Sequence, residues 1–319
     1  MSPALRRLLG RIGGTLLVVL VVAVGFTLAS LVTSLLAMLA LGADADAESV
    51  TAWVAGRPLL VTALGWVVTI PALVLLARFA FGLQPGVMGL RRPPGASPRR
   101  PRFLAGVACG LLLILAPAAV ARLFGGFVAA SPAELAALTV PTGLSAIPSI
   151  VYMLPALIFA ALGEEVLFRG LLLRFWEPVA GTRGALVLSA VLFSAIHLSN
   201  PGASPLGLIG VVLAGLMLGL IFLARGDLWL AAGVHLGWNA AEAMVLGVPV
   251  SGLMVPSLLR WSVADSDAAR GLLGSGFGPE EGLLFHAALA TGIVATLALS
   301  RGPREAVAPT DEDPGPGHV

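Results

Sequence analysis

Long runs of apolar residues dominate the chain, and charged or turn-forming residues separate them. About 20 apolar residues are enough for a helix to cross the hydrocarbon core of a membrane. Eight runs predict such spans: 12–43, 58–79, 103–121, 146–176, 184–198, 206–224, 228–246 and 282–300. The pattern therefore predicts an all-α fold, a polytopic transmembrane helical bundle with about eight spans. The fifth span is short, and the turn-rich stretch 199–205 makes its end the least defined boundary.

The arginines orient this bundle. All 19 basic residues are arginine, and with a cytoplasmic N-terminus fifteen of them fall on the inner side of the predicted spans. The outer side keeps four, namely Arg57, Arg122, Arg260 and Arg270. Because short cytoplasmic loops carry the excess of basic residues, the N-terminus and the C-terminus are both predicted to be cytoplasmic. Exclusive use of arginine suggests a GC-rich bacterial genome, so we expect a multi-pass protein of the bacterial inner (plasma) membrane.

Composition excludes several classes of protein. Hydrophobic residues make up 58% of the chain and charged residues only 11%, whereas a soluble domain has about 25% charged residues. An ordinary soluble enzyme and a disordered chain are therefore excluded. The single cysteine, Cys109, cannot form an internal disulfide. A net charge of +2 indicates no nucleic-acid partner.

Ionisable side chains inside membrane spans cost about 2.5–3.5 kcal/mol each on insertion scales and mark functional sites. Three predicted spans carry polar groups of this kind: Glu164, Glu165 and Arg169 in the fourth, His197 in the fifth, and His235, Asn239 and Glu242 in the seventh. Residues four apart share one face of a helix, so Glu165 and Arg169 are predicted to form an ion pair. Glu164 is turned about 100° away, which leaves it free to face a cavity.

These groups also share a depth. At about 1.5 Å per residue from the cytoplasmic end of each span, Glu164 lies about 15 Å deep, His197 about 21 Å, His235 about 12 Å and Asn239 about 18 Å. The hydrocarbon core is about 30 Å thick, so all four fall near its middle. Three separate helices therefore converge on one site. Glu242 shares the stripe of His235 and is either a partner of that histidine or part of the wall of the site.

The motifs Glu164-Glu165-x-x-x-Arg169, Phe193-x-x-x-His197 and His235-x-x-x-Asn239 follow one another on successive predicted helices. This ordered set resembles the CAAX-protease and bacteriocin-processing family (CPBP, also called Abi) of intramembrane proteases. The resemblance implies hydrolysis of a peptide bond in a membrane-associated or lipidated substrate, reached from the bilayer or the cytoplasm. By the same resemblance, Glu164 with His197 activates the attacking water. His235 and Asn239 stabilise the oxyanion, and the Glu165–Arg169 pair keeps the helix face in register.

The resemblance covers about residues 103–247 and divides the chain into four regions. Residues 1–102 form an N-terminal two-span region with a basic cytoplasmic loop, and 103–247 form the CPBP-like core. Residues 248–300 provide an outer loop and the last span. The tail, 301–319, is rich in proline and acidic residues and is predicted to be disordered.

The role of a metal stays open at this point. The family is commonly described as a metalloprotease, and Glu164, His197 and His235 are the residue types of a His₂Glu zinc site with one open position. Without a metal, the same residues act on water and substrate directly. The sequence is compatible with both mechanisms.

Two other functions are alternatives to a protease. One is a proton-coupled transporter with Glu164, His197, His235 and Glu242 as its relay. The other is a non-catalytic membrane scaffold. No internal repeat pairs the two halves of the chain, which counts against a transporter. All motif residues are present, which counts against an idle scaffold.

Overall fold

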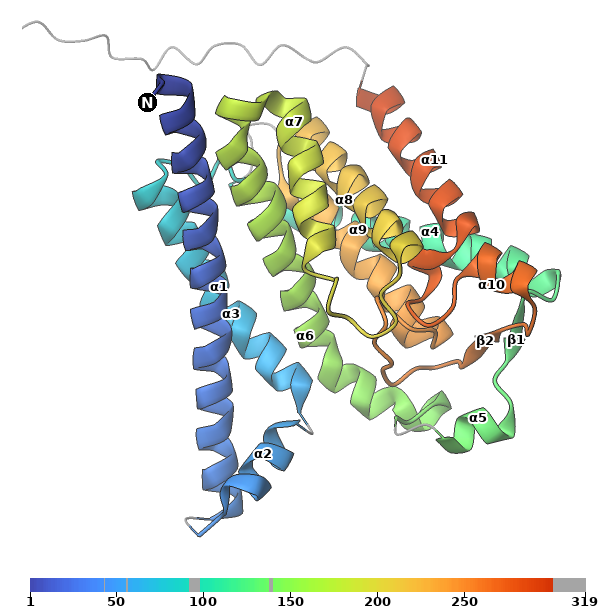
Figure 1. Cartoon of the computed structure of the whole chain (residues 1–319). Coiled ribbons are helices and arrows are strands. Elements are labelled where there is room, and N and C mark those ends of the chain that lie inside the picture. The colour runs from blue at the N-terminus through green and yellow to red at the C-terminus, as the bar shows by residue number, and fades with distance from the viewer. Residues whose placement is uncertain (43, 56, 92–97, 138–139, 301–319) are drawn as a thin grey trace, which may run out of the picture.

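The computed structural model describes residues 1–42, 44–55, 57–91, 98–137 and 140–300, which are mostly helical (Figure 1). The tail at 301–319 and part of the basic loop, 92–97, lie outside the described residues. The long helices are α1 (Pro3–Leu41), α3 (Pro58–Ala80), α4 (Arg99–Leu123), α6 (Ile147–Glu165), α7 (Arg174–Ala195), α8 (Pro205–Arg225), α9 (Leu228–Ala240) and α11 (Leu283–Ser300).

Shorter elements connect these helices. They are α2 (Ala47–Ala55), α5 (Pro132–Ala137), α10 (Asp267–Leu273), the 3₁₀ turns η1 (Gly143–Ala146) and η4 (Pro279–Glu281), and the π-helical segments η2 (Val166–Leu173) and η3 (Ala241–Leu246). Two short strands, β1 (Phe127–Ala129) and β2 (Trp261–Val263), pair antiparallel, with Phe127 opposite Val263.

Six helical stretches of the described chain are long and apolar enough to cross a membrane: Pro3–Leu41, Leu60–Ala80, Arg99–Leu123, Gly143–Ala195, Pro205–Arg225 and Leu283–Ser300. The fourth contains two predicted spans, because the chain turns at Gly181, whose φ of 67° and ψ of 166° are not helical. The seventh predicted span corresponds to α9 followed by η3. The predicted all-α, polytopic bundle is confirmed, while the number of spans and the side of the termini stay predictions.

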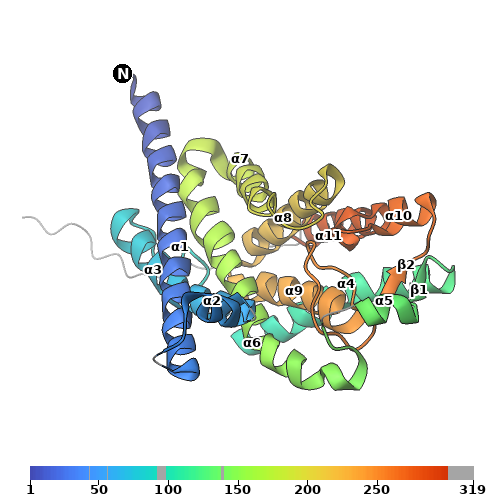
Figure 2. The same cartoon turned by 60° about the horizontal axis from the view of Figure 1, so that its bottom comes forward.

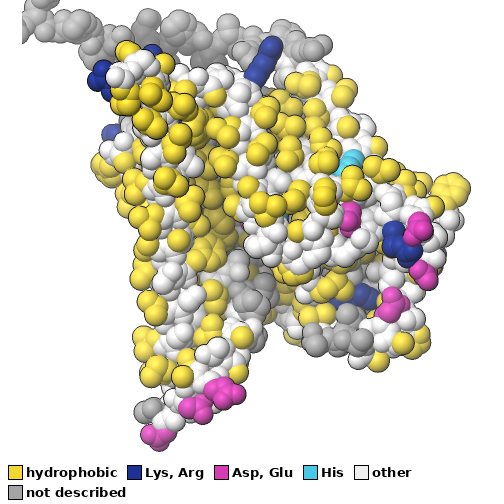
Figure 3. All heavy atoms as spheres, viewed as in Figure 1, with side chains coloured by type: hydrophobic (Ala, Val, Ile, Leu, Met, Phe, Trp, Pro, Cys, Tyr) yellow, Lys and Arg dark blue, Asp and Glu magenta, His cyan; other side chains and the backbone are white. Residues whose placement is uncertain are grey.

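The helices form one bundle with a distinct N-terminal edge. Helices α1 and α3 pack side by side along one edge, and α10 with the small sheet lies at the opposite edge (Figures 1 and 2). The start of α1 and the end of α11 lie at the same end of the molecule, at the top of Figure 1. Arginine side chains lie near this end, acidic side chains occupy the lower tip, and apolar side chains cover the flank between them (Figure 3).

Helices α4 and α9 touch through their backbones. Both carry two glycines four residues apart, Gly106 and Gly110 on α4 and Gly233 and Gly237 on α9. A Cβ atom at Gly110 would lie 2.1 Å from the carbonyl oxygen of Val234, and one at Gly237 would lie 2.2 Å from that of Val107. Small residues at this spacing let membrane helices approach closely. This contact fixes α9, the helix that carries His235 and Asn239.

Candidate active site

The two glutamates of the first motif end α6, where the helix widens into the π-helical segment η2. All residues of η2 are buried, and π-helical turns frequently occur at functional sites. The two side chains diverge as predicted. Glu165 is fully buried, whereas the side chain of Glu164 is 18% exposed and lines a cavity.

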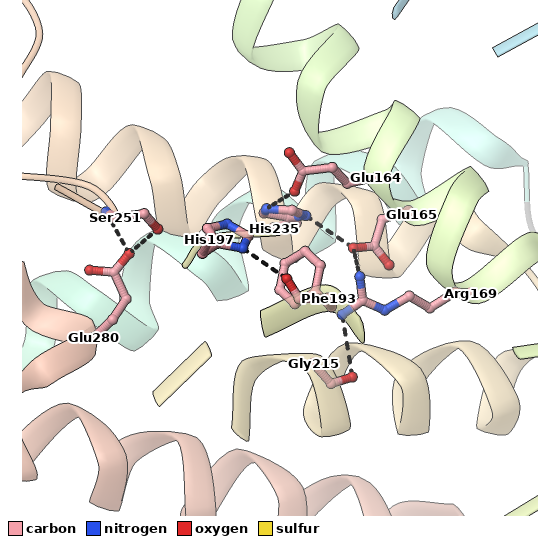
Figure 4. A network of polar contacts seen from close by, with 9 residues as sticks. All are labelled: Glu164, Glu165, Arg169, Phe193, His197, Gly215, His235, Ser251 and Glu280. Carbon is pink, nitrogen blue, oxygen red and sulfur yellow. Dashed lines mark hydrogen bonds and ion pairs between the residues drawn. The ribbon is translucent and has the colours of Figure 1, made fainter. Parts of the chain in front are cut away.

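Glu165 and Arg169 form the predicted ion pair. Their Oε1 and Nη1 atoms are 2.9 Å apart, and Arg169 is only 1% exposed. Arg169 also donates through Nη2 to the carbonyl oxygen of Gly215 on α8, at 3.3 Å (Figure 4). Its guanidinium lies 4.4 Å from the ring centre of Phe193. The pair therefore joins η2 to α7 and α8 and has no access to solvent.

His235 lies between the two glutamates (Figure 4). Its Nδ1 is 3.0 Å from Oε1 of Glu165, and its Nε2 is 3.6 Å from Oε2 of Glu164. Because the carboxylate of Glu165 is paired with Arg169 and only accepts hydrogen bonds, Nδ1 of His235 is the donor. In the neutral imidazole, Nε2 is then an acceptor that faces the free carboxylate of Glu164. Arg169, Glu165 and His235 thus form a chain of polar contacts that orients the imidazole toward Glu164.

His197 lies in the turn after α7, because that helix ends at Ala195. The prediction that the fifth span continues to residue 198 was wrong. Pro201 follows closely, and a helix usually ends before a proline and the residue that precedes it. The Nδ1 of His197 donates to the carbonyl oxygen of Phe193, at 2.8 Å, which leaves Nε2 as the acceptor in the neutral ring. The side chain of His197 therefore caps a carbonyl group in the last turn of α7.

Phe193 separates the two histidines. Its ring centre lies 5.1 Å from that of His197 and 5.8 Å from that of His235, both in edge-to-face geometry. Its side chain is 3% exposed. Phe193 therefore acts as the packing residue that fixes the distance between the two imidazoles.

One cavity of about 710 Å³ brings the predicted groups together, and its wall includes Glu164, His197, His235 and Asn239. The convergence expected from their common depth is therefore present in the structure. Among the described residues, Glu242 does not line this cavity. It lies in η3 and is fully buried. The sequence left open whether Glu242 is a partner of His235 or part of the wall of the site, and the structure supports neither interpretation.

Helices of the N-terminal region, which contains none of the three motifs, form part of the cavity wall. Phe26 of α1 and Trp66 of α3 line the cavity and contact each other edge to face, with ring centres 5.4 Å apart. Trp66 also lies directly against Gly163, the residue before Glu164. A Cβ atom at Gly163 would be 2.1 Å from Cε3 of that indole. An apolar tryptophan in an apolar span gives no signal in the sequence, so this contact was missed.

Loop residues supply another part of the wall. Glu280 of η4 accepts hydrogen bonds from the backbone N–H and the hydroxyl of Ser251, both at 2.8 Å. Ser251 has a φ of 44°, a left-handed conformation that is uncommon for a residue other than glycine. Asn200 donates to the carbonyl oxygen of Ser251, at 3.0 Å, and all three residues line the cavity. Burial raises the pKa of Glu280 from 4.5 to about 7. No motif marks these residues in the sequence.

The His₂Glu metal site that the sequence leaves open requires Glu164, His197 and His235 to converge on one point. Within the residues that the structure describes, no three His, Cys, Asp or Glu side chains are close enough together to hold one metal ion. Glu164 and His235 approach each other, but His197 does not complete a His₂Glu set with them. The donors present do not fit a zinc ion in this arrangement, so no step below is derived through a metal. Whether the reaction uses a metal is a question for experiment.

Comparison with known proteins gives one match. The family model described as type II CAAX prenyl endopeptidase Rce1-like matches residues 146–241, the segment that contains all three motifs. No curated protein and no solved structure matches the chain. The family indicates a protease, and together with the apolar helices it indicates a multi-pass membrane protein. Residues 146–241 thus match the CAAX-protease family that the motifs resemble, and the predicted resemblance is confirmed.

Proposed function

We propose that this protein is an intramembrane endopeptidase of the bacterial inner membrane, in which Glu164 is the general base that activates water. The observation that carries the proposal is the 3.6 Å approach between Glu164 and His235 in the wall of the cavity, within the family-matched segment. Nε2 of His235 and the carboxylate of Glu164 are both acceptors, so a hydrogen-bond donor is needed to bridge them. A water molecule at this position donates one hydrogen to each group and is thereby oriented for attack.

The bond changes follow from this arrangement. The water oxygen attacks the carbonyl carbon of the peptide bond, and its proton passes to the carboxylate of Glu164. The carbonyl oxygen becomes an oxyanion, to which the side-chain amide of Asn239 donates from the next turn of α9. When the intermediate collapses, the C–N bond breaks and Glu164 returns the proton to the leaving nitrogen. One peptide bond and one water give a carboxylic acid and an amine.

The histidines differ in role in this proposal. His235 is held by Glu165 and lies beside Glu164, which supports a function in water activation. His197 contributes an acceptor nitrogen across Phe193, which supports a function in binding the N–H group of the substrate amide. The expectation from the family resemblance assigns water activation to His197 and the oxyanion to His235. The two assignments make different kinetic predictions, given in the Discussion.

The substrate class is a membrane-associated or lipidated peptide or protein. The cavity is walled largely by apolar side chains, including Val22 and Phe26 of α1. Apolar side chains also cover the flank of the bundle (Figure 3). A chain segment anchored in the bilayer therefore meets an apolar surface on its way to the polar groups of the site.

Reconstitution tests the proposal. The full chain in vesicles is incubated with a membrane-anchored reporter peptide, and cleavage is compared between the wild type, Glu164→Gln and Glu48→Gln. Glu48 is an exposed glutamate on α2 and controls for loss of a carboxylate. We expect cleavage to fall by about 10²–10⁴-fold in Glu164→Gln and to persist in Glu48→Gln. Undiminished cleavage in Glu164→Gln refutes the assignment.

A further inference from the structure

A second cavity, of about 530 Å³, lies between α4, α8, α9 and α11. Cys109 on α4 and Leu299 on α11 line it, and both side chains are exposed, Leu299 to 75%. The cavity therefore opens at the flank of the bundle and not into its core. None of the groups assigned to water activation or to the oxyanion lines it.

The polar groups of this cavity gather toward one end. Arg225 and Ser300 are the last residues of α8 and α11. Most of the remaining lining side chains, such as Leu113, are apolar. The arginine distribution places the end of α8 on the cytoplasmic side. The cavity therefore has a cationic cytoplasmic end and an apolar part that extends toward the middle of the membrane.

The charge of Arg225 is available to a ligand. Its side chain is exposed, and it forms no ion pair or hydrogen bond among the described residues. The acidic residue closest to it in the sequence, Asp227, pairs with Arg102 and accepts a hydrogen bond from the backbone N–H of Trp229. Among the residues that the structure describes, no carboxylate lines the cavity.

We propose that this cavity binds one anionic phospholipid of the cytoplasmic leaflet. Its phosphate pairs with Arg225, since a guanidinium binds phosphate well, and one acyl chain lies against the apolar wall. The cytoplasmic leaflet contains anionic lipids. Each basic residue near its surface contributes about 1 kcal/mol of attraction to them. Met217 and Val234 line both this cavity and the catalytic one. The lipid therefore borders the active site, although its binding does not depend on the proposed proteolysis.

Native mass spectrometry of the delipidated full chain tests this site. The protein is mixed with phosphatidylglycerol and phosphatidylcholine of identical acyl chains, and the bound species are counted. We expect one phosphatidylglycerol to bind about fivefold more tightly than phosphatidylcholine. Arg225→Gln removes this preference. The matched control, Arg183→Gln, changes an exposed arginine that does not line the cavity and keeps the preference.

Two further variants locate the acyl chain. Cys109→Trp fills the cavity, and Leu299→Trp does so from an exposed position at which folding is not at risk. Both lower the binding of phosphatidylglycerol while Arg225 is present. A preference that survives Arg225→Gln, or binding unaffected by both tryptophans, overturns the proposal. Displacement of the lipid by inorganic phosphate also overturns it, because that result indicates a simple anion site.

Discussion

The Nε2 atom of His235 lies 3.6 Å from the Oε2 atom of Glu164, although 71 positions separate the two residues from α6 to α9. In the proposed mechanism, this contact supports water activation by His235 and substrate binding by His197. We therefore expect His235→Ala to lower kcat by about 10²-fold or more. His197→Ala is expected mainly to raise KM.

Steady-state kinetics with the reporter peptide separates kcat from KM for both variants. If His197→Ala lowers kcat while KM is unchanged, and His235→Ala retains water activation, the roles implied by the family resemblance are correct instead. Phe193→Leu serves as the control for packing, because it keeps both imidazoles and changes only the apolar residue between them.

Removal of Arg169 is expected to destabilise the protein. Glu165 is fully buried, so Arg169→Met leaves an unpaired charge and costs about 3–5 kcal/mol of stability. The double variant Glu165→Leu/Arg169→Met removes both charges and is expected to regain most of that stability. It stays inactive, because His235 has lost its acceptor at Nδ1. Thermal unfolding in detergent together with the cleavage assay distinguishes the two effects.

The contact between Trp66 and Gly163 is expected to position Glu164. Gly163→Ala introduces a Cβ atom only 2.1 Å from the indole and forces either Trp66 or α6 to move. A displacement of about 1 Å costs about 10²-fold in rate, and we expect a loss of that order. Gly13→Ala on α1 is the matched control, because nothing lies within 4 Å of its Cβ position. Adding Trp66→Leu to Gly163→Ala is expected to restore activity in part; no restoration would contradict a steric cause.

Stability is expected to fall as pH rises through neutrality, because of Glu280. Its pKa is raised from 4.5 to about 7 by burial, so the folded state holds a proton that the unfolded state has already lost. The stabilisation is complete below about pH 4.5 and is lost as pH passes 7, at an upper limit of about 3 kcal/mol.

Glu280→Gln isolates this effect from that of other carboxyl groups, such as its neighbour Glu281. The melting temperature of the wild type is expected to decrease between pH 5.5 and 8.5. In Glu280→Gln that decrease is expected to be smaller. Equal pH dependence in both proteins would show that Glu280 carries no such proton.

Chelation tests the remaining question of a metal. Since no three ligating side chains come together among the described residues, we expect cleavage to survive prolonged treatment with a strong zinc chelator. Loss of activity that zinc restores would contradict this expectation. It would show that His197 moves to join Glu164 and His235 in the active protein.

Local spacing made part of this site predictable. Glu165 and Arg169 are four residues apart on consecutive turns, and their ion pair follows from helix geometry alone. The depth of Glu164, His197, His235 and Asn239 predicted that they share a cavity. The partner of His235 was not predictable in the same way, because its contact with Glu165 joins residues 70 positions apart and depends on how α6 and α9 pack.

Other features leave no local trace in the sequence. Trp66 and Phe26 are apolar residues among many, and only tertiary packing directs them into the cavity. Glu280 and Ser251 belong to the segment between η3 and α11, whose path apolar periodicity does not determine. The π-helical segment at 241–246 is likewise not marked by the apolar periodicity, although an ideal helix puts Glu242 on the stripe of His235.

The backbone contact between α4 and α9 has a consequence for how the cavity opens. With glycines of both helices against carbonyl oxygens of the other, neither helix can rotate or slide without a backbone collision. The α4–α9 side of the cavity is therefore rigid, and it carries His235. The side built by α1 and α3 meets the rest of the bundle instead through side chains, namely Trp66 against Gly163 and one hydrogen bond from Trp176 to Thr15. We therefore expect a membrane-anchored substrate to reach Glu164 past the N-terminal helix pair, a region that the family match does not cover.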